Sequence, residues 1–178
     1  MHRRRLLALA GTGGALTLAG CLGGTNEEPA SEAVGEIETD WPTGPYNGDR
    51  YATTTVAVRS ESGTLRGAVR AVVPQSEPAY ELGLSVADSL PAAGGFLYTY
   101  ESVGERSYDM QDMSFGLDFV FADGDRTITA IRNAPAPGAG ETGTEQQYAA
   151  DGQYVLAVGY EWTDDNDVAV GDRLQFEL

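Results

Sequence analysis

The sequence contains no lysine, and its single cysteine and single histidine, Cys21 and His2, both lie within the first 21 residues. The rest of the chain therefore has no imidazole, thiol or amine side chain. Zinc sites of the Cys/His type, Ser-His-Asp triads, cysteine nucleophiles and Schiff-base lysines are excluded there. No intrachain disulfide can form. Any catalysis would depend on carboxylates, tyrosines, arginines or hydroxyls, and we expect no cofactor.

Positive charge is also scarce, because 11 arginines face 27 acidic residues in a chain of 178, a formal net charge of −16. Such a charge self-repels in dilute buffer, but at about 1 M salt the screening length falls to roughly 3 Å. An acidic chain without lysine is typical of a halophilic archaeon. The negative surface also disfavours nucleic acid as a partner.

The first twenty residues have the pattern of an export signal, with a basic start, a short apolar stretch and small residues before Cys21. Arg3 and Arg4, followed by Leu6 and Leu7, resemble a twin-arginine export signal. Residues 18–21 resemble a lipobox, which implies a lipid on Cys21 once residues 1–20 are removed. The alternatives are an uncleaved membrane helix, for which the apolar stretch is shorter than the roughly 20 residues required, and an unmodified thiol.

Lipidation would place the protein on the extracytoplasmic face of the cell membrane, and a stable anchor implies two acyl chains. Residues 21–49 are acidic and lack apolar periodicity, which predicts a disordered tether. Docking of Trp41 and Tyr46 on the domain is the alternative for these two residues, although lone aromatics in linkers are usually incidental. The sequence thus predicts a signal, a tether and one domain at residues 50–178.

The domain reads as a series of short strands separated by turns. We expect one short helix over residues 76–87. The expected strands are residues 53–59, 64–73, 96–100, 115–121, 127–132, 154–160 and 174–178. This order predicts a mainly β domain, an antiparallel sandwich or jelly-roll-like fold with one short helix.

Several segments together resemble the domain-of-unknown-function family 192. Gly83-Leu84, Leu90 and Gly95–Tyr98 resemble its GLM…L…GMLF run, and the later segments resemble its FWMKNT…PLDIVF, YVLEV and VGD motifs. These later segments are Tyr108–Met113 with Gly116–Phe121, Tyr154–Val158, and Val170–Arg173. The resemblance implies a jelly-roll-like β domain, often exported or membrane-tethered, and it implies no activity.

The chain departs from the family pattern at six positions. Relative to that pattern, the replacements are Asp109 for tryptophan, Gln111 for lysine, Asp112 for asparagine, Met113 for threonine, Gly116 for proline and Ala157 for glutamate. If the family shares a polar site, this chain has changed much of its edge.

Asp118 and Met110 are the candidate ligand-pocket residues. Asp118 interrupts an apolar strand, and a buried carboxylate must be paired or hydrogen-bonded. A structural role, with Arg132, Arg106 or a backbone turn as its partner, is the favoured interpretation. Met110 is more typical of core packing than of a binding site.

The other acidic groups predict no metal site. Asp109 and Asp112 are three positions apart, so on a strand they would point to opposite faces. Asp123-Gly124-Asp125 predicts a hairpin turn, and Asp172 a turn before the last strand. An EF-hand counted from Asp165 would need glycine at Val170 and glutamate at Phe176, so the calcium pattern fails.

The sequence favours a non-catalytic binding or accessory module at the cell surface. Its expected partners are the membrane, through the lipid, and an unidentified surface ligand or protein. The alternative is a carboxylate-dependent hydrolase, for example one acting on glycans, with Asp118 and a second acid brought close by the fold.

Overall fold

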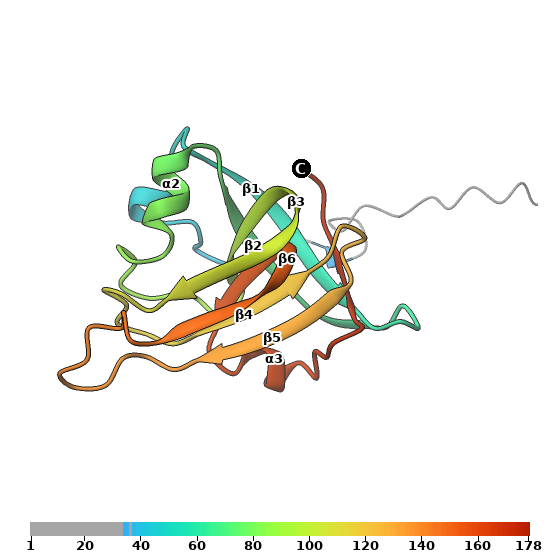
Figure 1. The fold of residues 1–178 in the computed structure, drawn as a ribbon. Coiled ribbons are helices and arrows are strands. Elements are labelled where there is room, and N and C mark those ends of the chain that lie inside the picture. Colours follow the sequence, from blue (N-terminus) through green and yellow to red (C-terminus); the bar gives the residue numbers. More distant parts are fainter. Residues whose placement is uncertain (1–33, 36) are drawn as a thin grey trace, which may run out of the picture.

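A computed structural model describes residues 34, 35 and 37–178, and the signal residues and Cys21 lie outside this part (Figure 1). The described chain forms one curled sheet with the strand order β5-β4-β6-β3-β2-β1-β7. The strands are β1 Tyr51–Arg59, β2 Leu65–Pro74, β3 Gly94–Asp109, β4 Leu117–Ala122, β5 Ile128–Ala134, β6 Gln147–Gly159 and β7 Arg173–Gln175. The short helical elements are η1 Gly44–Tyr46, α2 Glu77–Leu82 and α3 Trp162–Asp165.

The mainly β class is confirmed, but the sheet is mixed and forms a half-barrel, where the sequence predicted an antiparallel sandwich or jelly roll. β2 and β3 run parallel, with Arg70 opposite Gly94, whereas their other neighbours are antiparallel. The connection from Gln75 to Ala93 contains α2 and carries the chain back across the sheet. A parallel pair requires such a crossover, which strand periodicity alone does not reveal.

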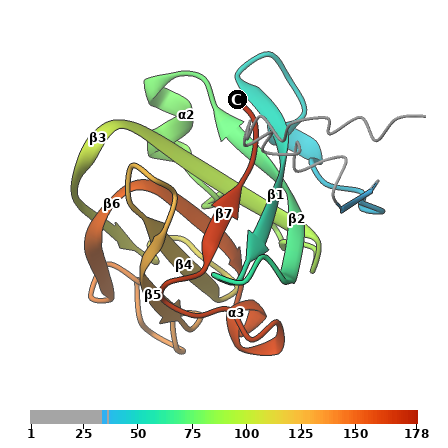
Figure 2. The same cartoon turned by 90° about the vertical axis from the view of Figure 1, so that its right-hand side faces the viewer.

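The two ends of the sheet approach each other through β7, which lies between β1 and β5 in Figure 2. β7 pairs with β1, and an isolated bridge joins Thr127 to Arg173. The backbone N–H of Ile128 donates to the Asp172 carbonyl at 2.8 Å, and that of Leu174 donates to the Arg126 carbonyl at 2.9 Å. The curl therefore brings the β4–β5 turn beside the last strand.

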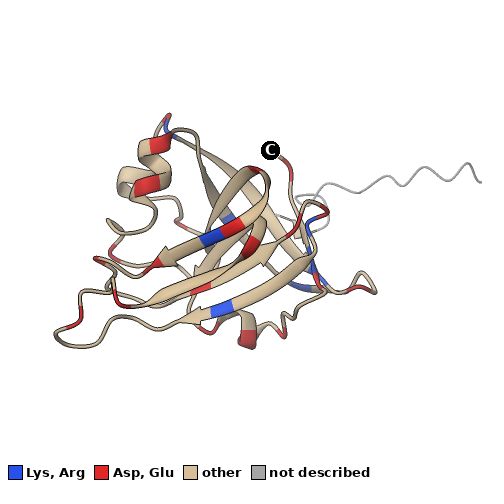
Figure 3. Cartoon of the chain, in the orientation of Figure 1, with Lys and Arg blue, Asp and Glu red and all other residues tan. Residues whose placement is uncertain are grey.

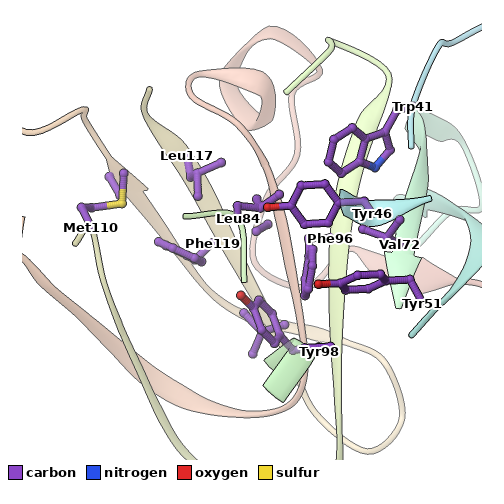
Figure 4. Close-up of a cluster of buried hydrophobic side chains, with 14 of the residues drawn as sticks. Trp41, Tyr46, Tyr51, Val72, Leu84, Phe96, Tyr98, Met110, Leu117 and Phe119 are labelled. Atoms are coloured by element: carbon purple, nitrogen blue, oxygen red, sulfur yellow. The ribbon is translucent and has the colours of Figure 1, made fainter. Parts of the chain in front are cut away.

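Apolar side chains cover both faces of the sheet. The layer inside the curl includes Val56, Leu97, Val120, Leu156 and Phe176. The layer on the other face includes Trp41, Tyr46, Phe96, Leu117 and Phe119 (Figure 4). Because successive strand residues point to opposite faces, Leu117 and Phe119 lie in one layer and Val120 in the other.

The predicted tether ends earlier than residue 49, because Trp41 and Tyr46 are both 2% exposed and belong to the outer apolar layer. The Trp41 indole N–H donates to the Gly95 carbonyl at 3.0 Å, and its ring lies 4.9 Å from that of Tyr46. The described folded unit therefore begins near Trp41. Within the described residues, no helix has both the length and the apolarity needed to cross a bilayer.

Candidate functional site

A pocket of about 630 Å³ lies where α2, the far half of β3, the turn after β3 and the start of β4 meet. Its floor is apolar and aromatic, with Leu84, Tyr98, Leu117 and Phe119 close together in Figure 4. Tyr80 and Tyr100 lie along one side. We refer to it below as the tyrosine pocket.

The aromatic groups of the tyrosine pocket hold one another in place. The Tyr108 ring stacks on Phe119 with a centroid distance of 4.9 Å and an interplanar angle of 13°. Tyr98 lies 4.9 Å from Tyr108, and the hydroxyl groups of Tyr100 and Tyr108 are 2.8 Å apart. Such packed rings present a preorganised apolar surface with hydroxyl groups at its edge.

Local sequence features explain how these groups meet. α2 ends at Leu82, and at the next residue, Gly83, φ is +49° and a Cβ would lie 2.6 Å from the Tyr98 hydroxyl oxygen. Glycine therefore permits both this backbone conformation and the close approach to β3. Tyr98 and Tyr100 are two positions apart on β3, which is typical of side chains on one face of a strand. Tyr108 lies beyond the irregularity between Thr99 and Gly104 and packs in the same apolar layer.

The rim of the tyrosine pocket is acidic. Glu77 and Glu81 on α2, Asp109 at the end of β3 and Asp112 in the turn after it all line the pocket, and all four residues are exposed. Within the described part of the chain, no arginine lines this pocket. The arrangement therefore combines aromatic faces with four negative charges, which favours a ligand that is positively charged and partly apolar.

Burial keeps Tyr98, Tyr100 and Tyr108 neutral. Desolvation raises the pKa of Tyr98 and that of Tyr108 far above the usual phenol value, and it raises the pKa of Tyr100 by less. At neutral pH these hydroxyl groups act as hydrogen-bond donors and acceptors and not as phenolate bases or nucleophiles. Their geometry is suited to binding.

The raised tyrosine pKa values predict a loss of stability in alkali. Burial raises the pKa of Tyr46 from 10.0 to about 12, so between these pH values an unfolded chain loses the proton that the folded chain retains. Stability is complete below pH 10 and falls as pH rises, since the unfolded state is then favoured. Urea unfolding at pH 9 and pH 11, with phenolate absorbance recorded in parallel, measures the effect. An unchanged urea midpoint would contradict these burial assignments.

Asp118 lies on the opposite face of β4 from the tyrosine pocket and is 0% exposed. Its carboxylate accepts hydrogen bonds from the Thr163 hydroxyl at 2.7 Å, the Thr163 N–H at 2.9 Å and the Asn133 amide at 2.9 Å. The N–H of Glu161 donates to it at 3.2 Å. The structural interpretation of Asp118 therefore agrees with the structure, with a backbone turn as the main partner.

Asp118 and Met110, the candidate ligand-pocket residues, are both fully buried, and neither lines the tyrosine pocket. Met110 is buried in the outer apolar layer, and its neighbours Asp109 and Gln111 line the tyrosine pocket. The suggested arginine partners of Asp118 lie elsewhere. Arg106 stacks over the Tyr100 ring at 3.8 Å, and Arg132 donates to the Ala149 carbonyl at 3.2 Å.

The remaining acidic candidates have structural roles. Asp123 accepts hydrogen bonds from the N–H groups of Asp125 and Thr127, both at 2.9 Å, as expected for a hairpin turn. Asp172 accepts from the Ala169 N–H at 2.9 Å, as expected for the turn before the last strand. Among the described residues, no group of three or more acidic, histidine or cysteine side chains is arranged to hold a metal ion.

Most of the motif segments singled out in the sequence contribute to the tyrosine pocket, whereas Leu90 and the Val170–Arg173 segment do not line it. Of the six positions that depart from the family pattern, five line it: Asp109, Gln111, Asp112, Met113 and Ala157. They come from the end of β3, the turn after it and β6. These departures from the family pattern therefore lie together around one pocket.

Sequence reasoning missed the tyrosines of the pocket as functional candidates. Tyr98 and Tyr100 are two positions apart on β3, and this spacing indicates that both aromatic side chains lie on the same face of the strand. Tyr80 joins them only through the crossover helix, where its hydroxyl donates to the Thr99 carbonyl at 2.7 Å.

Comparison with known proteins gives a family and a fold. Residues 57–176 match the sequence profile of DUF192, described as "Uncharacterized ACR". No curated protein matches the sequence. A solved structure from Sinorhizobium meliloti, provisionally described as a transcription regulator, is 21% identical with a TM-score of 0.64 and covers 72% of this chain and 97% of its own. A protein of unknown function from Novosphingobium aromaticivorans is 21% identical with a TM-score of 0.62, covering 86% and 99%. At this identity the two structures are similar in fold alone.

Proposed function

This chain belongs to the DUF192 family, and from that premise we propose that it is a non-catalytic binding module whose ligand occupies the tyrosine pocket. The observation that carries the proposal is the convergence of most of the motif segments on one preformed pocket, which five of the six departures from the family pattern also line. A shared position with altered rim chemistry suits a site whose ligand differs among relatives.

The chemistry of the tyrosine pocket favours an organic cation. A quaternary ammonium or polyamine group is attracted to the ring faces of Tyr98 and Tyr108 and to the carboxylates of the rim. In brine, where the screening length is about 3 Å, only direct contacts keep their strength. We therefore expect affinity to weaken with salt as the rim charges are screened and then to level off where ring contacts dominate.

The same geometry argues against the hydrolase alternative in the form that uses Asp118. Its carboxylate is fully buried, and both of its oxygen atoms accept hydrogen bonds from within the chain. A general acid must reach the leaving group, and this one is enclosed.

Neutralising the rim tests the binding proposal. We expect Asp109→Asn combined with Asp112→Asn to weaken the binding of spermidine and tetramethylammonium about tenfold at 0.1 M salt, because two rim charges are lost. The measurement is calorimetric titration of the full-length chain, with glucose and citrate as neutral and anionic probes.

The matched control is Asp164→Asn combined with Asp165→Asn, which removes two exposed acids on α3, away from the pocket. This variant should bind as the unaltered chain does. Equal loss in both pairs of variants would mean that general charge, and not the pocket, attracts the cation.

We further propose that the module is exported and held by a lipid on Cys21 at the outer face of a halophile's membrane. The support is the basic, apolar and small-residue order of residues 1–20 and the acidic, lysine-free composition. An acidic segment before Trp41 would keep the domain clear of the surface.

The anchor has its own test in the native cell. We expect Cys21→Ser to release the protein into the medium or to leave it unprocessed, since the sulfur that carries the lipid is lost. Fractionation and mass spectrometry of the N-terminus measure the outcome. Membrane retention of a correctly processed Cys21→Ser protein would contradict lipidation.

A further inference from the structure

A second pocket, of about 560 Å³, lies where the β1–β2 turn, the β4–β5 turn and β7 meet. Its lining includes Arg59, Arg126 and Arg173, which come from three separate parts of the chain. Figure 3 shows acidic positions spread over the molecule and few basic ones, several of them at the end with these hairpins. We call this the arginine pocket.

Each guanidinium is fixed by neutral groups. Arg59 donates to the Gln175 amide oxygen at 2.8 Å and to the Gly63 carbonyl at 3.0 Å. Arg126 donates to the Phe176 carbonyl at 2.8 Å and lies 4.2 Å from the centroid of that ring. Arg173 donates twice to the Asp125 carbonyl, at 3.0 and 2.9 Å. These contacts orient the three groups before any ligand arrives, which lowers the cost of binding.

Among the residues that the structure describes, no ion pair neutralises the positive charge of these arginines. Across the described residues, the one ion pair joins Arg66 to Asp172, and neither residue lines this pocket. Three arginines and two acids, Glu61 and Asp125, give the lining a formal charge of +1 in a chain whose net charge is −16. Within the described and acid-rich part of the chain, three arginines without an ion pair at one hollow point to a ligand that supplies the negative charge.

A guanidinium carries five N–H donors, and the contacts above use no more than two on each arginine. The planar fork of the unused donors matches the oxygen atoms of a phosphate, sulfate or carboxylate. We propose that the arginine pocket binds an oxyanion, either free or as the phosphate of a lipid headgroup. This site is separate from the tyrosine pocket and stands independently of the proposed function.

Titration with inorganic phosphate and with sulfate tests the site. The full-length chain with Cys21→Ser, which cannot be lipidated, is followed by backbone amide NMR at 0.1 M salt. We expect saturable shifts confined to the turns around Gly63 and Gly124 and to β7. Arg59→Gln and Arg173→Gln should each weaken binding at least tenfold, since each removes a charged fork.

Arg132→Gln is the matched control, because Arg132 is an exposed arginine outside the pocket. It should bind phosphate as the unaltered chain does. Arg59→Lys keeps the positive charge but loses the planar donors, so it should bind phosphate with intermediate affinity. This intermediate value would show that the weaker binding of Arg59→Gln reflects the lost guanidinium and not a folding defect. Absence of saturable shifts, or equal affinity in all variants, would overturn the proposal.

Sedimentation with vesicles distinguishes the two sources of the anion. Binding to phosphatidylglycerol vesicles but not to phosphatidylcholine vesicles, lost in Arg173→Gln, would identify a lipid headgroup. Phosphate binding without vesicle binding would identify a free oxyanion. Vesicle binding that survives in Arg59→Gln and Arg173→Gln, without phosphate binding, would contradict the site. Asp109→Asn combined with Asp112→Asn should leave all these results unchanged.

Discussion

Replacing Asp118 with alanine should lower the free energy of unfolding by about 3–5 kcal/mol, since several donors in or near the core lose their acceptor at once. The N–H and hydroxyl of Thr163, which is 1% exposed, both donate to this carboxylate. The N–H of Glu161, where φ is +66°, is the third backbone or hydroxyl donor that Asp118 satisfies. Without Asp118 the turn into α3 loses the group that orders it.

Urea unfolding of the full-length chain measures the effect. Asp118→Asn retains one acceptor oxygen, so it should lower the free energy of unfolding by less, about 2 kcal/mol. The remaining loss arises because its amide N–H₂ would face other donors. Asp164→Ala removes an exposed acid from α3 and should change stability by less than about 0.5 kcal/mol. If Asp118→Ala were as mild as Asp164→Ala, the buried hydrogen-bonded arrangement would be incorrect.

Replacing Trp41 with alanine should lower the free energy of unfolding by about 3–5 kcal/mol, as is usual for a buried tryptophan. The side chain fills part of the outer apolar layer against Tyr46, and its indole N–H satisfies the Gly95 carbonyl on β3. If residues up to 49 were only a tether, this change would have almost no effect.

Thermal and urea unfolding distinguish these two possibilities. Trp41→Phe keeps most of the apolar contact and loses the hydrogen bond to Gly95, so we expect the free energy of unfolding to fall by about 1–2 kcal/mol. Tyr160→Ala, at an aromatic side chain that is 43% exposed, serves as the control and should have a small effect. A small effect of Trp41→Ala would contradict a folded unit that begins near Trp41 and would favour the boundary at residue 50 predicted from the sequence.

The strands could be predicted where one face of each is apolar. Leu117, Phe119 and Phe121 alternate with Asp118, and this alternation correctly separated the two faces of β4. The turn at Asp123-Gly124-Asp125 was also correct, because its side-chain hydrogen bonds are local.

Features that depend on distant residues could not be predicted. The far half of β3 is polar, and its pairing with β6, for example Arg106 opposite Ala150, has no local pattern. The helix was predicted to reach residue 87, but it ends at Leu82, because Gly83 takes the conformation that lets α2 approach Tyr98. Trp41 is buried through a partner 54 residues away.

The candidate site shows the same limit. The motif segments were recognised from their order along the chain. Within these segments the sequence analysis selected Met110 and Asp118, and neither of them lines the tyrosine pocket. Asp118 was already expected to point away from Leu117 and Phe119, which form the pocket floor. Locating the tyrosine pocket required the crossover that places Tyr80 beside β3.

The two pockets differ in the charge and type of the side chains that line them. The tyrosine pocket offers aromatic faces and negative charge, and the arginine pocket offers unpaired guanidinium groups. They lie on different parts of the fold and have no lining residue in common. If both proposals hold, the chain would bind a cationic and an anionic ligand at separate places, and each proposal is tested by its own variants.

Tyrosine-resolved NMR tests the central claim most directly, because the nine tyrosines of the chain report on separate regions. The full-length chain with labelled tyrosine rings is titrated with spermidine and then with tetramethylammonium. The account predicts saturable shifts for the rings of Tyr98, Tyr100 and Tyr108, with Tyr154 unaffected. Saturable shifts confined to tyrosines outside the pocket, or no saturable shift with either cation, would contradict it.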